Sequence, residues 1–310
     1  MAEVHPPERA ARGTREETIG ALLVGTASLL FGSVVILGKL TLRRGLPVTS
    51  MLAIRYAAAA MVLALALAAL RRPLMPALGE RVAAPALGMC LYAVESALFF
   101  SALGHGTAAA VTLLFFTYPV LVTVVSWALG QGRPARLTIL ALASAVSGVG
   151  LVAGTGGGLA IQTAGVLFAL ASAGVYTSYL IGADLVLRKT NPMTSAMWVS
   201  AGAAVGLTVY TSLLGGGRLP SGWTEWWPVL GMGAATAGAF VCLMTGLQRI
   251  GAVRTSIVAS TEPLSTSLLA LVFLGESVSL GTALGGVLIL AGAIAASLAR
   301  EATVQEQQIP

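Results

Sequence analysis

Charged residues are scarce in this chain: Asp, Glu, Lys and Arg together make up 10% of its 310 residues. A soluble domain carries about 25%, so the composition excludes a water-soluble globular fold. Hydrophobic residues make up 56%, and the mean hydropathy is +0.88. The net charge of +6 does not indicate nucleic-acid binding, because the basic residues lie mainly in short loops between apolar runs.

Residues that often carry catalysis or bind metals are also rare. Asp184 is the only aspartate, which excludes an intramembrane Asp–Asp protease, and Cys90 and Cys242 have neither a CxxC spacing nor a nearby histidine. No G-x-x-x-x-G-K-[ST] loop is present, which disfavours ATP-driven pumping. We therefore expect no catalytic residue, no metal, no cofactor and no ATPase subunit, and an intramembrane enzyme is disfavoured.

Long hydrophobic runs fill most of the length. A transmembrane helix needs about 20 mostly apolar residues, and ten runs meet this requirement. They are residues 19–40, 48–70, 82–103, 107–129, 136–153, 162–183, 193–214, 226–247, 252–274 and 280–299. The sequence thus predicts an all-α integral membrane protein with ten transmembrane helices and polar tails at 1–17 and 300–310.

The distribution of positive charge predicts the orientation of these spans. Thirteen of the 18 Arg and Lys residues lie in the tails or at the loops that follow spans two, four, six and eight. Four lie at the opposite loops, and Arg55 lies inside a span. Because positive charge marks the cytoplasmic side, both termini are predicted to be cytoplasmic.

The two halves of the chain are related in sequence. A shift of 145 residues aligns residues 18–50 with residues 163–195 without a gap, and 11 of the 33 positions are identical. Several identities are polar residues or proline, so apolar composition alone does not explain them. Farther along, Pro119 aligns with Pro263 at a shift of 144.

Each half carries five predicted spans, in residues 18–154 and 155–299. Since five is odd, the second half enters the membrane from the opposite face. The sequence thus predicts two inverted five-helix repeats, an architecture typical of transporters whose halves move about a site at the midplane.

A carboxylate stands at the proline of the second repeat. Glu262 precedes Pro263 inside span nine, and Tyr118 precedes Pro119 inside span four. Proline frees a carbonyl and bends a helix, so we expect breaks at matching depth, although both prolines could serve packing alone. A charge near the bilayer centre costs about 2.5–3.5 kcal/mol, so we expect Glu262 to face a cavity, unless it only satisfies groups that the proline frees.

Two further charges, Arg55 and Glu95, lie at similar predicted depth on spans two and three. Their positions predict a salt bridge between them, which could hold helices together or contact a substrate. Aromatic residues follow helical spacing near these charges. The candidate cavity residues are Tyr92, Glu95, Phe99, Tyr118, Tyr176, Tyr179 and Glu262, and the same side chains could instead join helices.

Two segments resemble the paired motif of EamA-type carriers in the drug/metabolite transporter superfamily: LGHGTAAAVTLLFFTYPVLVTVVSWALGQ at residues 103–131 and LQRIGAVRTSIVASTEPLSTSLLALVFLGE at residues 247–276. The resemblance covers the whole membrane region. The first half departs from the motif, with Gln131 where Glu is usual and Tyr118 where the second half has Glu262. The sequence therefore predicts no symmetric role for these carboxylates.

The resemblance implies a secondary transporter, similar to bacterial exporters of aromatic amino acids, that acts on small amphipathic metabolites by alternating access. The chain has only two lysines, Lys39 and Lys189, against 16 arginines, which is typical of a GC-rich bacterial source and so predicts the bacterial inner membrane. A carrier that expels quaternary cations, with Glu95 and Glu262 as counter-charges, is the alternative. Anionic substrates are disfavoured because Arg55 is the only basic residue predicted deep inside a span. A small-molecule substrate and the lipid bilayer are the expected partners, and the oligomeric state is left open.

Overall fold

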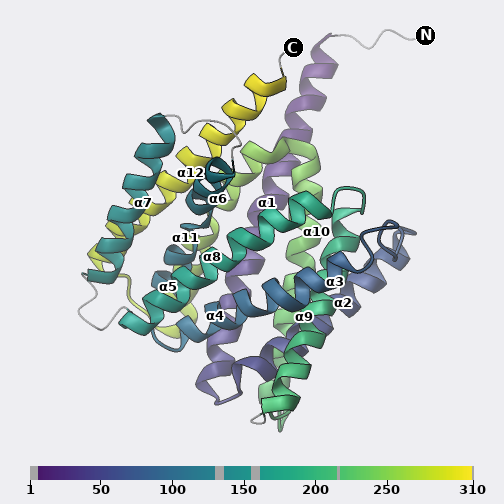
Figure 1. Cartoon of the computed structure of the whole chain (residues 1–310), viewed down its shortest axis with the longest axis vertical. Helices are drawn as coiled ribbons and strands as arrows, with labels where there is room; N and C mark the ends of the chain where they lie inside the picture. The colour runs from purple at the N-terminus through teal and green to yellow at the C-terminus, as the bar shows by residue number, and fades with distance from the viewer. Residues whose placement is uncertain (1–5, 130–135, 155–160, 215–216, 309–310) are drawn as a thin grey trace.

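The structure, a computed structural model, describes residues 6–129, 136–154, 161–214 and 217–308. These residues form helices and no strand (Figure 1). The elements are α1 (Pro6–Arg43), α2 (Val48–Ala69), α3 (Ala83–Leu87), the π-helical turn η1 (Gly88–Tyr92), α4 (Ala93–Leu103), α5 (Ala108–Phe115), α6 (Tyr118–Ala128), α7 (Arg136–Gly154), α8 (Thr163–Val186), α9 (Pro192–Leu214), α10 (Trp223–Ala259), α11 (Glu262–Leu274) and α12 (Leu280–Gln308).

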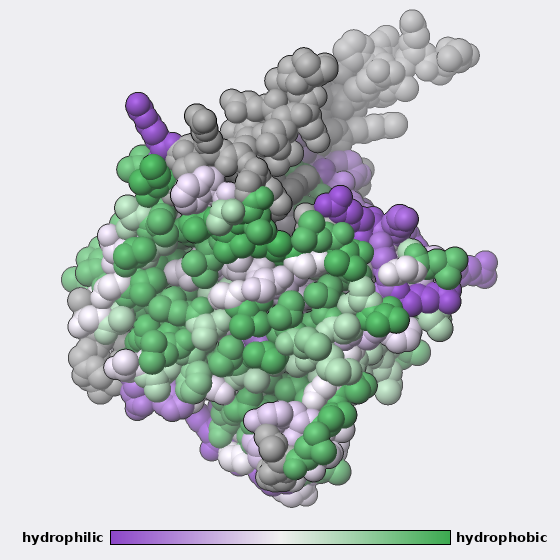
Figure 2. Space-filling model, viewed as in Figure 1, coloured by the Kyte–Doolittle hydropathy of each residue, from purple (hydrophilic) through white to green (hydrophobic). Residues whose placement is uncertain are grey.

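The surface is that of a membrane protein. Large apolar side chains such as Leu65, Leu167 and Phe273 are more than 60% exposed, whereas soluble monomers rarely expose extended apolar patches. In Figure 2 hydrophobic residues dominate the visible face and hydrophilic ones gather at its edges. These side chains face lipid, so the prediction of an all-α multi-pass membrane protein is confirmed.

The prediction of ten full-length spans is met only in part. Within the described residues, seven helical segments are long and apolar enough to cross a membrane. Three predicted spans contain shorter apolar helices instead, at Ile139–Gly154, Glu262–Leu274 and Leu280–Ala295. The second of these is short because the proline break divides the predicted span 252–274.

The two helix breaks have the same construction. Helical structure is interrupted at residues 116–117 and 260–261, a spacing of 144 residues, and a proline follows as the second residue of α6 and of α11. The Thr117 hydroxyl donates to the Leu114 carbonyl over 2.8 Å, and the Thr261 hydroxyl donates to the Val258 carbonyl over 2.6 Å. Each break thus carries a threonine whose hydroxyl bonds to the carbonyl three residues earlier.

The predicted loop between residues 247 and 252 is helical, because α10 continues through it. The chain nevertheless turns back there. Ile250 packs against Gly20 near one end of α1, whereas Ala259 lines a cavity together with Phe31, farther along α1. A straight helix would carry Ala259 about 14 Å beyond Ile250 and away from that cavity, so α10 bends back between these two residues.

Both predicted tails are also largely helical. α1 begins at Pro6 rather than near residue 18, and α12 continues to Gln308. Glu, Arg and Ala are abundant in residues 8–17 and have high helix propensity, so the backbone continues the helix beyond the apolar run.

The helix contacts follow the predicted two-fold relation between the halves. In the first half, α1 packs on α10 and α11 of the second. In the same way, α8 of the second half packs on α4, α5 and α6 of the first. The remaining helices pair across the halves, α2 with α9 and α7 with α12. α1 and α8 run in opposite directions: Lys39, near the end of α1, donates to the Gly106 carbonyl, and Gln162, just before α8, donates to the His105 carbonyl. This course agrees with the predicted inversion of the repeats.

Two glycines bring α9 close to the third span. A Cβ atom added at Gly88, in η1, would lie 2.0 Å from the Val199 carbonyl oxygen, and one added at Gly202 would lie 2.0 Å from the Pro85 carbonyl oxygen. Backbone atoms cannot give way as a flexible side chain does. The third span therefore packs against α9 at the turn η1.

We expect Gly88→Ala to destabilise the protein by about 1–3 kcal/mol or more, because the new methyl group overpacks a backbone contact. Thermal unfolding in detergent measures this loss. The matched control is Gly150→Ala in α7, where an added Cβ meets nothing within 4 Å and alanine favours the helix. Equal unfolding temperatures for the two variants would contradict the packing argument.

The loops that join α2 to α3 and α8 to α9 are linked by Glu80. Its carboxylate accepts from the Lys189 amide over 2.8 Å, the Thr190 amide over 2.9 Å and the Thr190 hydroxyl over 2.5 Å. These donors, the Thr190 hydroxyl foremost, hold the pKa of Glu80 below its ordinary value. The link is therefore strongest while Glu80 is ionised.

The stability that Glu80 contributes is expected to be complete above its unfolded pKa of about 4.3 and lost as pH falls through the lower folded pKa. Thermal unfolding of wild type and Glu80→Gln across this range tests the expectation. The gap between the two proteins should be widest near pH 7 and narrow toward pH 3. A gap that does not change with pH would rule out ionisation of Glu80 as its source.

Candidate functional site

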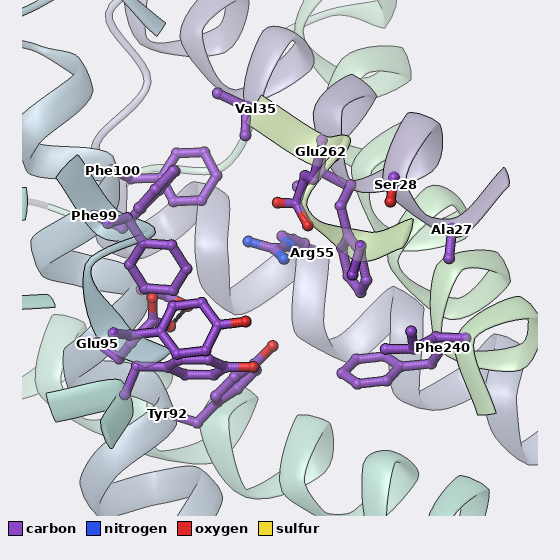
Figure 3. A pocket seen from close by; sticks show the side chains of 18 residues that line it. Ala27, Ser28, Val35, Arg55, Tyr92, Glu95, Phe99, Phe100, Phe240 and Glu262 are labelled. Carbon is purple, nitrogen blue, oxygen red and sulfur yellow. Dashed lines mark hydrogen bonds between the residues drawn. The ribbon is translucent and has the colours of Figure 1, made fainter. Parts of the chain in front are cut away.

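A cavity of about 160 Å³ lies where α1, α2, α4, α8 and α10 meet the two helix breaks (Figure 3). One water needs about 10–15 Å³, so the cavity has room for several waters or a small solute. Eighteen residues line it, and most are apolar or aromatic. The charged residues among them are Arg55, Glu95 and Glu262.

Aromatic rings form a continuous wall, called the aromatic wall below. In order of contact its members are Phe99, Phe115, Tyr118, Tyr176, Tyr179 and Tyr92. Neighbouring ring centroids lie 4.9 to 5.8 Å apart, within the range of favourable aromatic pairs. Ring faces of this kind attract both other rings and cations.

The structure brings most of the sequence-predicted site residues together. Those that line the cavity are Arg55, Tyr92, Glu95, Phe99, Tyr118, Tyr176 and Glu262. Tyr179 does not line it but packs behind the lining, between Tyr92 and Tyr176. Pro119 and Pro263 stand next to lining residues at the two breaks.

Sequence reasoning missed the wall that α1 and α10 contribute. Phe31 and Phe240 line the cavity and contact each other edge to face, with ring centroids 5.8 Å apart. Ala27, Ser28 and Val35 continue the same face of α1. Their helical spacing is the available signal, but an apolar stripe of this kind looks the same whether it faces lipid or a cavity.

Glu262 is the first residue of α11 and lines the cavity beside the break. Among the described residues it has no hydrogen-bond or ion-pair partner. An ionised carboxylate has no hydrogen-bond donor, so Glu262 cannot satisfy a carbonyl that the proline frees. A carboxylate without a protein partner is free to bind a cationic solute or a proton.

Glu95 has a different environment. Its carboxylate accepts from the Ser96 hydroxyl over 2.8 Å and from the Ser172 hydroxyl over 3.1 Å. Ser96 is in turn hydrogen-bonded to the Tyr56 hydroxyl. Glu95 is 6% exposed, so this network holds its carboxylate in one position at the cavity wall.

The predicted salt bridge between Arg55 and Glu95 is wrong. No ion pair within the described residues joins them; Arg55 Nε instead donates to the Thr236 hydroxyl over 3.1 Å. The backbone of α2 at Arg55 lies against Gly233 of α10, which brings Thr236, one turn farther along, within reach. The Arg55 guanidinium also lies over the Tyr56 and Phe100 rings, with centroids at 4.7 and 5.4 Å.

A second group of charges, called the outer cluster below, lies at the end of the molecule where α1 ends. Lys39 Nζ lies 2.5 Å from Glu276 Oε1, and Arg43 Nη2 lies 3.6 Å from the same oxygen. The other Glu276 oxygen accepts from the Ala108 amide over 2.7 Å. The outer cluster thus joins α1 to the first residue of α5 and to the segment after α11.

Comparison with known proteins agrees with this architecture. The EamA-like transporter family matches residues 18–154 and again residues 163–298. The chain is 27% identical over 208 residues to YwfM, an uncharacterized transporter of Bacillus subtilis, covering 65% of this chain and 69% of the relative. It is 30% identical over 227 residues to YicL, an uncharacterized inner membrane transporter of Salmonella typhimurium, covering 69% and 73%.

A solved crystal structure of a protein has the same fold, with a TM-score of 0.64, 20% sequence identity, and coverage of 90% of this chain and 97% of the other. Both halves of the chain match the family, and the curated relatives are transporters rather than enzymes by name. The protein therefore belongs to the EamA-like transporter family.

Proposed function

We propose that the protein is a secondary transporter that exports small amphipathic metabolites, in particular amino acids including aromatic ones. The observation that carries the proposal is the Glu262 carboxylate, which has no partner among the described residues and faces a cavity with an aromatic wall. It suits a solute that has an ammonium group at one end and an apolar or aromatic body.

The position of Glu262 supports alternating access about this cavity. α11 has 13 residues and so spans about 20 Å of a hydrocarbon core of about 30 Å. Its first residue therefore lies well inside the membrane, at a discontinuous helix of the kind that forms the substrate site in inverted-repeat transporters. α6 starts at the matching position in the other repeat, so each half can move about its own break.

Efflux of quaternary cations is a second candidate. Two carboxylates, those of Glu95 and Glu262, line the cavity. Two like charges beside aromatic rings favour a cation between them. A quaternary cation has no acceptor for the Arg55 guanidinium, which also lines the cavity.

Export from proteoliposomes separates the two candidates. We expect vesicles that contain the protein to release labelled L-phenylalanine faster than empty vesicles and to retain labelled benzyltrimethylammonium. The reverse pattern would replace the amino-acid proposal with cation efflux. Repeating the assay with and without a pH gradient determines whether protons are coupled.

We further propose that the protein resides in the bacterial inner membrane with both termini in the cytoplasm. The distribution of positive charge supports this orientation, and one relative is named an inner membrane transporter. Periplasmic alkaline phosphatase fused to the C-terminus should be inactive and green fluorescent protein fused there should be bright. An active phosphatase fusion would overturn the orientation.

A further inference from the structure

Arg55 has unused hydrogen-bonding capacity inside the cavity. The residue is 5% exposed, and among the described residues its one hydrogen bond runs from Nε to Thr236. A guanidinium carries five N–H donors, so the four on the terminal nitrogens have no protein acceptor in that part of the chain. These nitrogens border the cavity and are not fully enclosed by protein, so a solute inside the cavity can accept from them.

We propose that Arg55 binds a carboxylate of the substrate and that Thr236 is the residue that positions it; this inference rests on the proposed transport of amino acids. The two terminal nitrogens of a guanidinium form a planar fork that matches the two oxygens of a carboxylate. In the view of Figure 3, Arg55 projects into the space between Glu262 and the side of the cavity formed by Phe99 and Tyr92.

The charges of the cavity match those of an amino acid. Glu262 has no partner among the described residues and suits the ammonium group, whereas Glu95 already accepts from Ser96 and Ser172. Arg55 then suits the carboxylate, and the aromatic wall suits the side chain. An amine without a carboxylate would leave the Arg55 fork unsatisfied at the cavity wall, so Arg55 determines specificity.

Thr236 fixes the plane of this fork. It is fully buried on α10, and its hydroxyl accepts from Arg55 Nε over 3.1 Å. The close approach of α2 at Gly233 holds the two helices in register, and the Tyr56 and Phe100 rings flank the guanidinium. With Nε engaged by Thr236, the fork formed by the two terminal nitrogens stays available to a second acceptor.

Three probes of similar shape separate the roles of the charges: L-phenylalanine, phenethylamine, which lacks the carboxylate, and 3-phenylpropionate, which lacks the amine. Binding of each is measured with wild type, Thr236→Val, Thr236→Ser and Arg55→Lys in proteoliposomes. Thr236→Val keeps the shape but removes the acceptor. Thr236→Ser keeps the hydroxyl and should bind as wild type does, which controls for folding.

We expect Thr236→Val to weaken binding of L-phenylalanine about tenfold, which corresponds to one hydrogen bond to a charged group. Arg55→Lys should weaken it at least as much, because lysine lacks the fork. Binding of phenethylamine should not change in either variant. Equal losses for phenylalanine and phenethylamine, or no loss for phenylalanine, would overturn the role of Arg55.

The same probes distinguish this inference from the proposed function. Binding of 3-phenylpropionate but not phenylalanine by wild type, lost in both variants, would overturn amino-acid transport and support Arg55 as the carboxylate site. Binding of phenethylamine alone by wild type would overturn both.

Discussion

Glu262→Gln is expected to lower transport at least tenfold while membrane abundance and thermal stability stay at wild-type values. Glutamine keeps the size of the side chain and removes its charge. Because the carboxylate has no hydrogen-bond or ion-pair partner among the described residues, the substitution removes no bond that stabilises the fold. Removing a charge from membrane depth, where it is costly, also favours the folded state.

Glu95→Gln provides the contrast. Its carboxylate accepts from two serine hydroxyls, and the NH2 group of glutamine cannot accept, so at least one charge-assisted hydrogen bond is lost. We therefore expect Glu95→Gln to lower thermal stability, which Glu262→Gln does not. Wild-type transport rates in Glu262→Gln, with Pro263→Ala the more damaging change, would show that the proline break matters and the carboxylate does not.

Lys39→Met is expected to destabilise the protein by about 3–5 kcal/mol, because it leaves a buried carboxylate without its main counter-charge. The side chains of Lys39 and Glu276 are 11% and 10% exposed, so water compensates little. Thermal unfolding in detergent measures the loss. The outer cluster also ties α1 to both broken spans, so transport should fall with stability.

A double variant tests whether the charge pair is the cause. Lys39→Met with Glu276→Gln leaves no unpaired charge from this pair, and the glutamine oxygen can still accept from the Ala108 amide. We expect the double variant to regain most of the stability that Lys39→Met loses. Losses that simply add in the double variant would show that the two residues act independently.

Sequence reasoning located most of the cavity because its signals were rare residues in an apolar chain. Glu262, Glu95 and Arg55 stand out where charge is costly, and the prolines stand out where helices should continue. Depth could be read from position in each run. The rotation of each helix about its own axis could not be read from the sequence. For this reason the sequence predicts Glu95 as the partner of Arg55, whereas its partner in the structure is Thr236.

Other features left weaker traces in the sequence. Phe31 and Phe240 lie in stripes that are apolar whether they face lipid or a cavity. The sequence predicts a loop near residues 247–252, where the structure has a helical segment of α10 that bends. Hydropathy indicates where a span ends but not how the backbone turns there. The outer cluster was missed because Lys39 lies at the end of an apolar run and its partner is more than 200 residues away.

The turn η1 explains why the offset between the repeats changes. Gly88 and Gly233 match at a shift of 145 and both sit at close helix contacts, whereas Pro119 and Pro263 match at 144. The first repeat therefore holds one extra residue between these points. The turn η1, at residues 88–92, has room for it, because a π turn closes over one more residue than an α turn.

An inserted residue in a regular helix would rotate everything that follows by about 100°. In the third span the residues after η1 include Glu95 and Phe99, which line the cavity. The second repeat has no such turn in α10, and its residues at the corresponding positions are Ala239 and Leu243. The turn η1 thus lets Phe99 face the cavity as its counterpart Leu243 does in α10, and the carboxylate of Glu95 in place of the methyl group of Ala239 makes two similar halves chemically unequal.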